Sequence, residues 1–228
     1  MYKRQNEKTG VRSFTGHDEL PDFHKDMLEC VFWGLGGDGT IGANKNSIKI
    51  IGNNTGLGVQ GYFSYDSKKS GGVTVSYLRF GEGDIRSAYL IQRPEFVACH
   101  NESYVLKYDM LSGMKQGGVF LLNCEWDVSE LDEKLPDDMK YQIAMKKLDF
   151  YIINAVHTGK EIGINGKINT ILQSAFFKIV CDRYAKKYGL MSYEEAVGYM
   201  KEAARASYEV KGCLLYTSPS PRDAHESR

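Results

Sequence analysis

The sequence lacks any closely spaced pair of cysteines. Its five cysteines, at positions 30, 99, 124, 181 and 213, are scattered, and no CxxC motif occurs. Disulfide frameworks and zinc or iron–sulfur sites need cysteines at characteristic short spacings, so neither kind of site is expected in this chain. We expect the thiols to be buried in the core as small apolar side chains.

The chain also lacks an excess of charge of one sign and any long apolar run. Lys plus Arg and Asp plus Glu both number 29, so no global field would attract nucleic acid or an acidic membrane. No apolar run approaches the roughly 20 residues of a membrane span, and the first ten residues, MYKRQNEKTG, lack the apolar middle of a secretory signal. We therefore predict a cytoplasmic protein that binds neither nucleic acid nor membranes.

What the chain does have is enough apolar residues for one substantial core: 42% of its 228 residues are hydrophobic. Strand-like runs alternate with helical periodicities, which predicts an α/β fold, a three-layer α/β/α sandwich around a mostly parallel or mixed sheet. The apolar runs at 118–123 and 150–154 are typical of central strands covered on both faces. The predicted strands are 30–33, 57–66, 73–79, 87–91, 118–123 and 150–154, and the predicted helices are 40–51, 104–111, 137–147, 169–187 and 193–208, the last capped by Ser192.

The two ends of the chain look foreign to this fold. One set of codons for Cys213–Ser218, read from the opposite strand with GTG as a start codon, encodes Met-Tyr-Lys-Arg-Gln, the first five residues. The ends are thus similar to the transposon ends used to fragment DNA for sequencing. We interpret 1–5 and 213–228 as adapter-derived, the alternative being a natural disordered tail. The polar residues 6–29 are interpreted as a linker from a missing upstream domain, and 30–212 as the domain itself.

A glycine-rich loop stands between the first predicted strand and the first predicted helix. Gly34-Leu-Gly-Gly-Asp-Gly39 satisfies GxGxxG, a pattern that lets backbone amides approach a phosphate at the positive end of a helix. No acidic residue follows at the position that would bind the ribose of a dinucleotide, and there is no GK[ST] sequence. The loop alone leaves open a phosphate site or a tight turn without a ligand. Lys45, Lys49 and the turn KKSGG at 68–72 favour the phosphate site, although paired lysines are also common in solvated turns.

Two other polar features have simpler interpretations. His100-Asn101, which follows the apolar stretch 96–98, suggests acid–base chemistry, but no nucleophile elbow or paired acid accompanies it. We interpret His100 as a structural histidine. Asp137-Asp138 after a proline is typical of a helix N-terminus, where carboxylates suit the helix dipole, and is not predicted to bind metal.

Five segments resemble, in order and spacing, the gamma domain of the pyruvate:ferredoxin (flavodoxin) oxidoreductase family. They are FWGLGGDGTIGANKNSIKIIG, QGYFSYDSKKSGGVTVSYLRFG, FVACHNESYVLKYDML, GGVFLLN and GKINTILQSAFFKI, within residues 31–212. The resemblance implies an enzyme that oxidatively decarboxylates pyruvate, passes electrons to ferredoxin or flavodoxin, and releases acetyl-coenzyme A. It also implies that thiamine diphosphate, magnesium and [4Fe-4S] clusters are bound by domains outside this chain, and that the whole enzyme is a homodimer. The chain alone would be inactive.

The resemblance implies that this domain binds coenzyme A and carries no catalytic or metal-binding residue. The matching positions are Gly37, Asp38, Gly39, Thr40 and Ile41 of the loop, Lys69 or in second place Lys68, Asn169 of GKIN, and Lys211 of the C-terminal VKG. The phosphates of coenzyme A suit loop amides and lysines. Three positions depart from the family pattern: Gly37 replaces a usual serine, Asn165 and Lys167 lie where a glycine-rich segment with arginine is usual, and Lys211 adjoins the foreign tail.

Two alternatives remain open at this point. The chain could be a stand-alone gamma subunit of a multi-subunit 2-oxoacid oxidoreductase, which the predicted linker at 6–29 argues against. It could also be a dinucleotide-dependent oxidoreductase, a hypothesis that rests only on the GxGxxG match. Whether the chain is a domain of a longer 2-oxoacid oxidoreductase or a separate gamma subunit, its expected partners are the remaining domains or subunits of that enzyme. The whole enzyme is expected to bind ferredoxin or flavodoxin as its electron carrier.

Overall fold

The computed structural model describes residues 4–5, 12–13, 27–66, 71–163 and 168–210. Its centre is a six-stranded mixed sheet with the strand order β4-β5-β3-β6-β7-β8. Four neighbouring strands run parallel: β3 (Met27–Leu35), β6 (Phe96–Cys99), β7 (Val119–Asn123) and β8 (Asp149–Ile153). Beside β3 lies an antiparallel hairpin of β4 (Gly58–Tyr65) and β5 (Val73–Gly81). The two-residue strands β1 (Arg4–Gln5) and β2 (Arg12–Ser13) pair with each other and form a separate two-stranded sheet.

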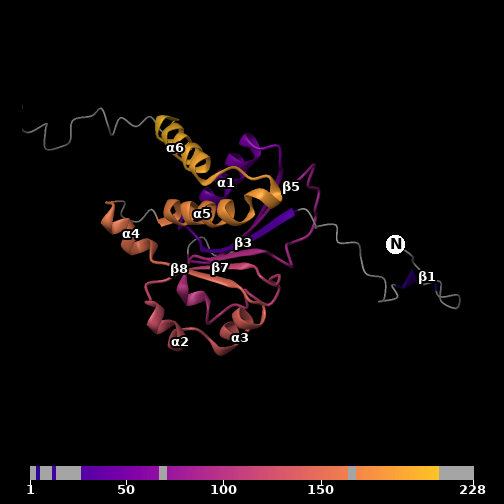
Figure 1. Ribbon diagram of the computed structural model, residues 1–228, viewed down its shortest axis with the longest axis vertical. Helices are drawn as coiled ribbons and strands as arrows, with labels where there is room; N and C mark the ends of the chain where they lie inside the picture. The colour runs from indigo at the N-terminus through magenta and orange to yellow at the C-terminus, as the bar shows by residue number, and fades with distance from the viewer. Residues whose placement is uncertain (1–3, 6–11, 14–26, 67–70, 164–167, 211–228) are drawn as a thin grey trace, which may run out of the picture.

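Helices cover both faces of the sheet (Figure 1). One face carries α1 (Thr40–Asn54), α5 (Ile168–Tyr188) and α6 (Tyr193–Val210), and the other carries α2 (Leu131–Lys134) and α3 (Asp137–Met145). The short helix α4 (Ala155–Glu161) follows β8. The predicted three-layer α/β/α sandwich is therefore confirmed. Within the described ranges, no helix combines the length and the apolar character needed to cross a bilayer.

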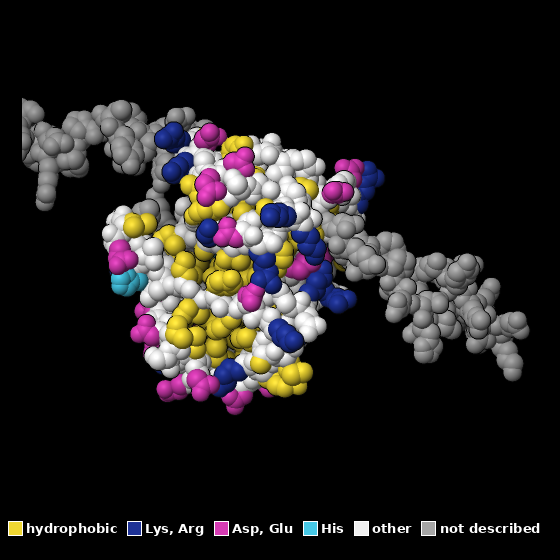
Figure 2. Space-filling model, in the orientation of Figure 1, with side chains coloured by type: hydrophobic (Ala, Val, Ile, Leu, Met, Phe, Trp, Pro, Cys, Tyr) yellow, Lys and Arg dark blue, Asp and Glu magenta, His cyan; other side chains and the backbone are white. Residues whose placement is uncertain are grey.

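The sheet separates two hydrophobic cores because successive side chains of a strand point to opposite faces. Cys30 and Phe32 of β3 face α5, where the Phe32 and Phe176 rings lie 5.1 Å apart between centroids. Val31, between them in sequence, belongs to the core on the other face together with Phe120 of β7. The space-filling view shows hydrophobic side chains gathered between the two helix layers (Figure 2).

Most predicted elements are present, with bounds that differ by a few residues. The first strand begins at Met27, so the last three residues of the predicted linker belong to the sheet, and Leu28 is fully buried. The capping prediction is confirmed at the last helix: Ser192 Oγ accepts from the Glu195 backbone N–H at 3.3 Å, and the Glu195 carboxylate accepts from the Ser192 N–H at 2.8 Å. The short strand β6 and the helix α4 were not predicted as such.

The predicted strand at 87–91 is wrong. The backbone there is bound by side chains instead of a neighbouring strand: the Ser87 carbonyl accepts from Gln60 Nε2 and the Tyr89 carbonyl accepts from Arg79 Nη2, both at 2.8 Å. These tertiary contacts override the β-propensity of SAYLI. The segment therefore lies across the hairpin as a loop.

The predicted helix at 104–111 is also wrong. A 3₁₀ turn, Glu102–Tyr104, follows Asn101, whose side chain accepts from the Ser103 N–H at 3.0 Å, and the chain then continues in turns. Tyr104 is buried and donates its hydroxyl to the Gly34 carbonyl at 3.3 Å, so tertiary packing decides the conformation of this short segment. The predicted position of one strand in the sheet was wrong as well. The apolar run at 150–154 was predicted to form a central strand, but the strand found there, β8, lies at an edge of the sheet.

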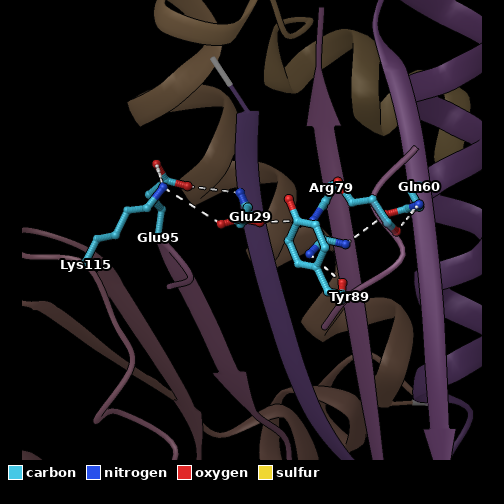
Figure 3. Close-up of polar contacts among 7 residues, drawn as sticks. Glu29, Gln60, Arg79, Tyr89, Glu95 and Lys115 are labelled. Atoms are coloured by element: carbon cyan, nitrogen blue, oxygen red, sulfur yellow. Dashed lines mark hydrogen bonds and ion pairs between the residues drawn. The ribbon is translucent and has the colours of Figure 1, made fainter. Parts of the chain in front are cut away.

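A buried arginine joins three strands near the start of β3 (Figure 3). Arg79 on β5 is 2% exposed, and its Nε donates to Glu29 Oε1 on β3 at 3.0 Å. Its Nη1 donates to Gln60 Oε1 on β4 at 2.8 Å, and its Nη2 to the Tyr89 carbonyl. The guanidinium thus fixes the hairpin against the parallel part of the sheet through several charge-assisted hydrogen bonds.

A second buried carboxylate extends this network to the helix layer. Glu95 Oε2 accepts from the Glu29 backbone N–H at 3.0 Å, and Glu95 Oε1 accepts from Lys115 Nζ at 3.0 Å and from the Tyr188 hydroxyl at 2.8 Å. Two carboxylates and two cations balance, so the charges are buried without a net charge. The network (Glu29, Gln60, Arg79, Glu95, Lys115 and Tyr188) connects the hairpin, β3, the residues that precede β6 and β7, and α5.

The substitution Arg79→Met should lower the free energy of unfolding by about 3–5 kcal/mol, because it leaves the Glu29 carboxylate buried without its guanidinium partner. Urea denaturation of the chain measures this change. Arg86→Met is the matched control, because Arg86 pairs with Asp84 at the surface with side-chain exposures of 86% and 82%, and should change stability by less than about 1 kcal/mol. Equal small effects for both variants would contradict the structural role of Arg79.

Candidate functional site

The candidate site lies at the carboxyl ends of the parallel strands. Open α/β sheets bind ligands at this edge because the loops that follow neighbouring parallel strands meet there. The glycine loop, residues 36–39, follows β3 and opens α1, while His100 follows β6 and Asn123 ends β7. The predicted strand–loop–helix context of the glycine loop is therefore confirmed.

Asp38 organises the glycine loop through its carboxylate. Its Oδ2 accepts from the Leu35 N–H and from the Thr40 hydroxyl, both at 2.8 Å, and its Oδ1 accepts from the Thr40 N–H at 2.7 Å. These bonds close the turn between β3 and α1 and satisfy a donor of the first helical turn. Since both carboxylate oxygens face the loop itself, Asp38 positions the loop and would meet a ligand only through its backbone.

The two exposed positions of the loop are glycines in the left-handed region. Gly37 has φ 96° and Gly39 has φ 87°, conformations that glycine adopts without the strain of a side chain. Thr40, by contrast, is 1% exposed and packs against Gly34, and Ile41 is half-buried in the first turn of α1. A phosphate approaching the loop would therefore meet backbone at Gly37 and Gly39 rather than the Thr40 hydroxyl.

His100 holds the loop from the next strand. Its Nδ1 lies 2.8 Å from Thr40 Oγ1. The Thr40 hydroxyl donates to Asp38, so the histidine Nδ1 carries the proton and donates to the hydroxyl oxygen. Burial lowers the pKa of His100 to about 4, against the opposite influence of the Asp38 charge, so the imidazole is neutral at pH 7. This geometry agrees with the interpretation of His100 as a structural histidine.

Asn123 continues the chain of hydrogen bonds across the strand ends. Its Nδ2 donates to the His100 carbonyl at 3.0 Å, and its Oδ1 accepts from the Ala155 N–H at 3.0 Å, at the start of α4. Sequence reasoning missed Asn123, although a polar residue that ends a fully apolar run is a usable signal. The hydrogen-bond chain Asp38–Thr40–His100–Asn123 thus links the loops after β3, β6, β7 and β8.

Helix α5 brings a second helix N-terminus to the loop. Asn169 Nδ2 donates to the Gly39 carbonyl at 3.4 Å, and one turn later Gln173 Nε2 donates to the Ala43 carbonyl at 3.1 Å and to Ser47 Oγ at 2.9 Å. Because these contacts advance in the same direction along both helices, α1 and α5 run parallel with their N-termini side by side. Asn169 was predicted from the family resemblance, whereas the buried Gln173 was missed.

The end of the lysine turn contacts the glycine loop. The Gly36 N–H donates to the Gly72 carbonyl at 2.7 Å, and the Gly71 N–H donates to the Gly36 carbonyl at 3.4 Å. Lys69 lies outside the described residues, as do Lys68, Lys211, Asn165 and Lys167.

The lysines of α1 are not brought to the loop. Lys45 lies over the Phe63 ring of β4, with its Nζ 5.3 Å from the ring centroid, and Lys49 is a turn further along the exposed side of the helix. At a rise of about 1.5 Å per residue, the two Cα atoms are roughly 8 Å and 14 Å beyond that of Thr40 along the helix axis. The support that these two lysines gave to a phosphate site is therefore weaker than the sequence suggested.

Four of the five cysteines lie in the described part of the chain, and all four are buried, as expected. Burial raises the pKa of Cys99 and of Cys181 to about 12, so these thiols are protonated at neutral pH and are weak nucleophiles. No group of three or more His, Cys, Asp or Glu side chains that could hold a metal ion is found among the described residues. The described part of the candidate site is thus built from exposed loop backbone held by the Asp38 carboxylate, the Thr40 hydroxyl, the His100 imidazole and the Asn169 amide.

Comparisons with known proteins agree on one family. The family model described as pyruvate ferredoxin/flavodoxin oxidoreductase matches residues 29–210. A pyruvate:ferredoxin oxidoreductase of Moorella thermoacetica is 53% identical over 188 residues, which are 82% of this chain and 15% of that protein. The chain thus spans 15% of the length of this curated relative.

Solved structures share the fold at low sequence identity. The gamma subunit of a keto/oxoacid ferredoxin oxidoreductase from Geobacter sulfurreducens matches with a TM-score of 0.54 and 20% identity, over 79% of this chain and 89% of that one. A 2-oxoglutarate:ferredoxin oxidoreductase from Magnetococcus marinus, solved with 2-oxoglutarate, coenzyme A and succinyl-CoA, matches with a TM-score of 0.50 and 16% identity, over 79% of this chain and 31% of that one.

The buried neutral histidine predicts a specific acid sensitivity. Between pH 6.5, the ordinary pKa of histidine, and about 4, its pKa in the folded chain, the unfolded chain binds a proton that the native chain does not. The free energy of unfolding should therefore fall as the pH falls through this window, with His100 contributing about 2–3 kcal/mol of the loss between pH 7 and 4.5. Urea denaturation of the wild type and of His100→Gln at pH 7 and at pH 4.5 isolates the contribution of His100 to this loss of unfolding free energy. A pH dependence that is identical in the two proteins would contradict the assignment.

Proposed function

Because the chain belongs to the pyruvate ferredoxin/flavodoxin oxidoreductase family, we propose that it is the part of such an enzyme that binds coenzyme A. The parent enzyme would convert pyruvate to acetyl-coenzyme A in the cytoplasm and pass the electrons to ferredoxin or flavodoxin. Thiamine diphosphate, magnesium and [4Fe-4S] clusters would be bound by its other domains or subunits, and the whole enzyme would be a homodimer. This chain would supply a binding surface rather than catalytic groups.

The observation that carries the proposal is the exposed backbone of Gly37 and Gly39 beside the N-termini of α1 and α5. Each helix N-terminus presents unpaired N–H groups and a partial positive charge, so two of them side by side favour an anionic group. The negative charge of Asp38 opposes an anion at this place, but its carboxylate accepts three hydrogen bonds within the loop and is turned toward the protein. A phosphate of coenzyme A fits these requirements.

Lysines would supply positive charge to the site, because the described residues at the glycine loop include no lysine or arginine. The turn that contains Lys69 ends at Gly71 and Gly72, which contact Gly36 of the loop, and this supports a direct contact between Lys69 and a phosphate of coenzyme A. Lys211 and Asn169 would also contact the ligand. Asn169 lies against Gly39, which supports a contact between its side chain and a ligand on the loop.

The topology argues against the dinucleotide alternative. In a dinucleotide-binding fold, the helix after the glycine loop leads to a parallel strand beside the first strand, whose end carries the acidic residue for the ribose. Here α1 leads into β4, which lies at the sheet edge and belongs to an antiparallel hairpin. The strand beside β3 on the parallel side is β6, which leads to His100 and Asn101 rather than to an acid.

A separate gamma subunit remains the second candidate. It is favoured by the Geobacter sulfurreducens gamma subunit, a chain of which 89% is covered by this fold. The relative of 53% identity, however, is about six to seven times longer than the matched region, which makes up 15% of it. The identity to this long relative, 53%, is much higher than the 20% identity to the Geobacter sulfurreducens gamma subunit. The comparison therefore favours a domain of a long chain over a separate subunit.

Removal of the Lys69 ammonium should weaken coenzyme A binding by the parent enzyme. A charge-assisted hydrogen bond contributes about 1.5–3 kcal/mol, so Lys69→Ala should raise the Kd for coenzyme A about 10- to 100-fold. Isothermal titration measures the change, and Lys201→Ala on the exposed side of α6 is the control that should leave the Kd unchanged. Tight binding of NAD with no response to coenzyme A would reject the proposed function in favour of the dinucleotide alternative.

Substitutions at Gly37 test whether a serine hydroxyl at this position, which is usual in the family, contributes to binding of coenzyme A. A side chain at Gly37 meets no atom within 4 Å, but its φ of 96° imposes strain on any other residue, about 1–2 kcal/mol. Gly37→Ser and Gly37→Ala share this strain, and only serine adds a hydroxyl. We expect the serine variant to bind coenzyme A more tightly than the alanine variant in titrations of the parent enzyme. Equal affinities would mean that the loop backbone alone holds the ligand.

A further inference from the structure

Strand β8 has the composition of a central strand but lies at an edge of the sheet. Phe150, Tyr151, Ile152 and Ile153 are apolar on both faces, a pattern typical of strands that are covered on all sides. Among the strands of the described residues, only β7 pairs with β8. All four side chains are partly exposed, and that of Tyr151 is 43% exposed.

The backbone of β8 presents an open row of hydrogen-bonding groups. The Asp149 N–H donates to the Gly118 carbonyl at 2.9 Å, and the Ile153 carbonyl accepts from the Cys124 N–H at 3.0 Å. In a parallel pair, alternate residues direct both backbone groups to the same neighbour, so Phe150 and Ile152 direct theirs away from β7. Among the described residues, no hydrogen bond to the outward backbone groups of these two residues is found.

The side chains of β8 form an apolar surface above and below this open backbone. Phe150 stacks on Phe120 at 5.3 Å between ring centroids and packs with Ile152 at the margin of one core, while Ile153 packs at the margin of the other. In Figure 2, hydrophobic side chains gather at the middle of the face, between the layer of α5 and the layer of α2 and α3. An extended apolar segment beside β8 would extend both cores.

Strand β8 lacks the sequence features that usually prevent an edge strand from pairing with another strand. Such strands usually carry lysine, proline, a bulge or an inward charge that prevents another strand from pairing. The only charged residue of β8 is Asp149, at its first position, and this carboxylate is paired with Arg183. The opposite edge strand differs, because β4 (GVQGYFSY) contains two glycines and polar residues at positions 60 and 64.

The size of the open edge favours an occupant from the same enzyme over a second copy of the domain. A stable interface between separate proteins buries about 800 Å² on each partner, which is more than the edge of a five-residue strand offers. A domain of the same polypeptide needs less area, because linkage raises its effective concentration. Since the matched region makes up 15% of a relative of 53% identity, such domains exist in the family.

We propose that another domain of the parent oxidoreductase docks on the edge of β8 by adding an extended apolar segment beside it. The segment would pair with the outward backbone groups of Phe150 and Ile152, and its side chains would cover Tyr151 on one face and the margin of the opposite core on the other. This interaction adds a seventh strand to the sheet. It does not depend on the coenzyme A site, which lies at the ends of the strands rather than at this edge.

Hydrogen–deuterium exchange of the intact parent enzyme, read by mass spectrometry with residue-level fragmentation, tests this pairing. The amides of Phe150 and Ile152 should exchange on the order of 100-fold more slowly than unprotected amides, because they would be hydrogen-bonded to the added strand. Free exchange of both amides in the intact enzyme would overturn the proposal. Protection that is lost when the enzyme is diluted to single polypeptides would assign the edge to a second copy and would also overturn it.

Matched lysine substitutions on the two sheet edges separate docking from a general effect of charge. Tyr151→Lys should abolish the protection of the Phe150 and Ile152 amides, whereas Tyr62→Lys on β4, at a tyrosine that is 55% exposed, should not. The Leu121 amide on β7 reports in both variants that the sheet is folded. Retained protection in Tyr151→Lys, with a folded sheet, would contradict the proposal.

A proline variant provides the test if Tyr151→Lys fails to fold. Ile152→Pro removes an N–H that points away from β7, so the hydrogen bonds between β7 and β8 are kept while the outward donor is lost. The Phe150 amide should then lose its protection in the intact enzyme while the Leu121 amide keeps its own. Full protection of Phe150 in this variant would overturn the proposal.

Discussion

The buried ion pair between Arg79 and Glu29 is the interaction on which the arrangement of the sheet depends. It joins an antiparallel hairpin to four parallel strands, and through Glu95 it reaches α5. Burying charges is costly, so the pair stabilises the fold only because every partner is present with good geometry. The ion pair therefore selects one arrangement of the strands, because separating β5 from β3 would part the buried charges of Arg79 and Glu29.

The same strand carries this network at one end and the glycine loop at the other. β3 has nine residues, from Met27 to Leu35, and spans roughly 30 Å at about 3.3 Å per residue. At its carboxyl end, the hydrogen-bond chain Asp38–Thr40–His100–Asn123 holds the loop to the ends of the neighbouring strands. Because the Asp38 and Thr40 side chains are engaged within the protein, the exposed backbone of the loop is held in one conformation. This would lower the entropic cost of binding the proposed ligand.

The two surfaces proposed to bind, the glycine loop and the β8 edge, use different parts of the sheet. The loop lies at the ends of the strands, where helix N-termini and lysines suit a phosphate. The edge lies along β8, where open backbone groups and apolar side chains suit another strand. A domain that binds a coenzyme on one side and its neighbours on another would hold the coenzyme in a fixed position relative to the rest of the enzyme.

Much of this fold follows from the sequence alone. Local periodicity predicted five of the six strands of the large sheet (β3, β4, β5, β7 and β8). It also predicted the long helices, the Ser192 cap and the strand–loop–helix context of residues 34–40, because these features depend on neighbours within a few positions. Family motifs pointed to Asn169, which the structure places against Gly39. Local patterns failed at 87–91 and 104–111, where Arg79, Gln60 and Gly34 bind the chain in other conformations.

The sequence by itself therefore determined most of the elements, the layers and the glycine loop, while only the tertiary structure decided which strands are neighbours. Nothing local distinguishes the apolar run of β8 from that of β7, yet one is an edge and the other is central. Likewise, no spacing links Glu29 to Arg79, or Thr40 to His100, which are 50 and 60 positions apart. The reason is physical: periodicity reports which side of an element is buried, whereas pairing depends on contacts between distant residues that the whole fold selects at once.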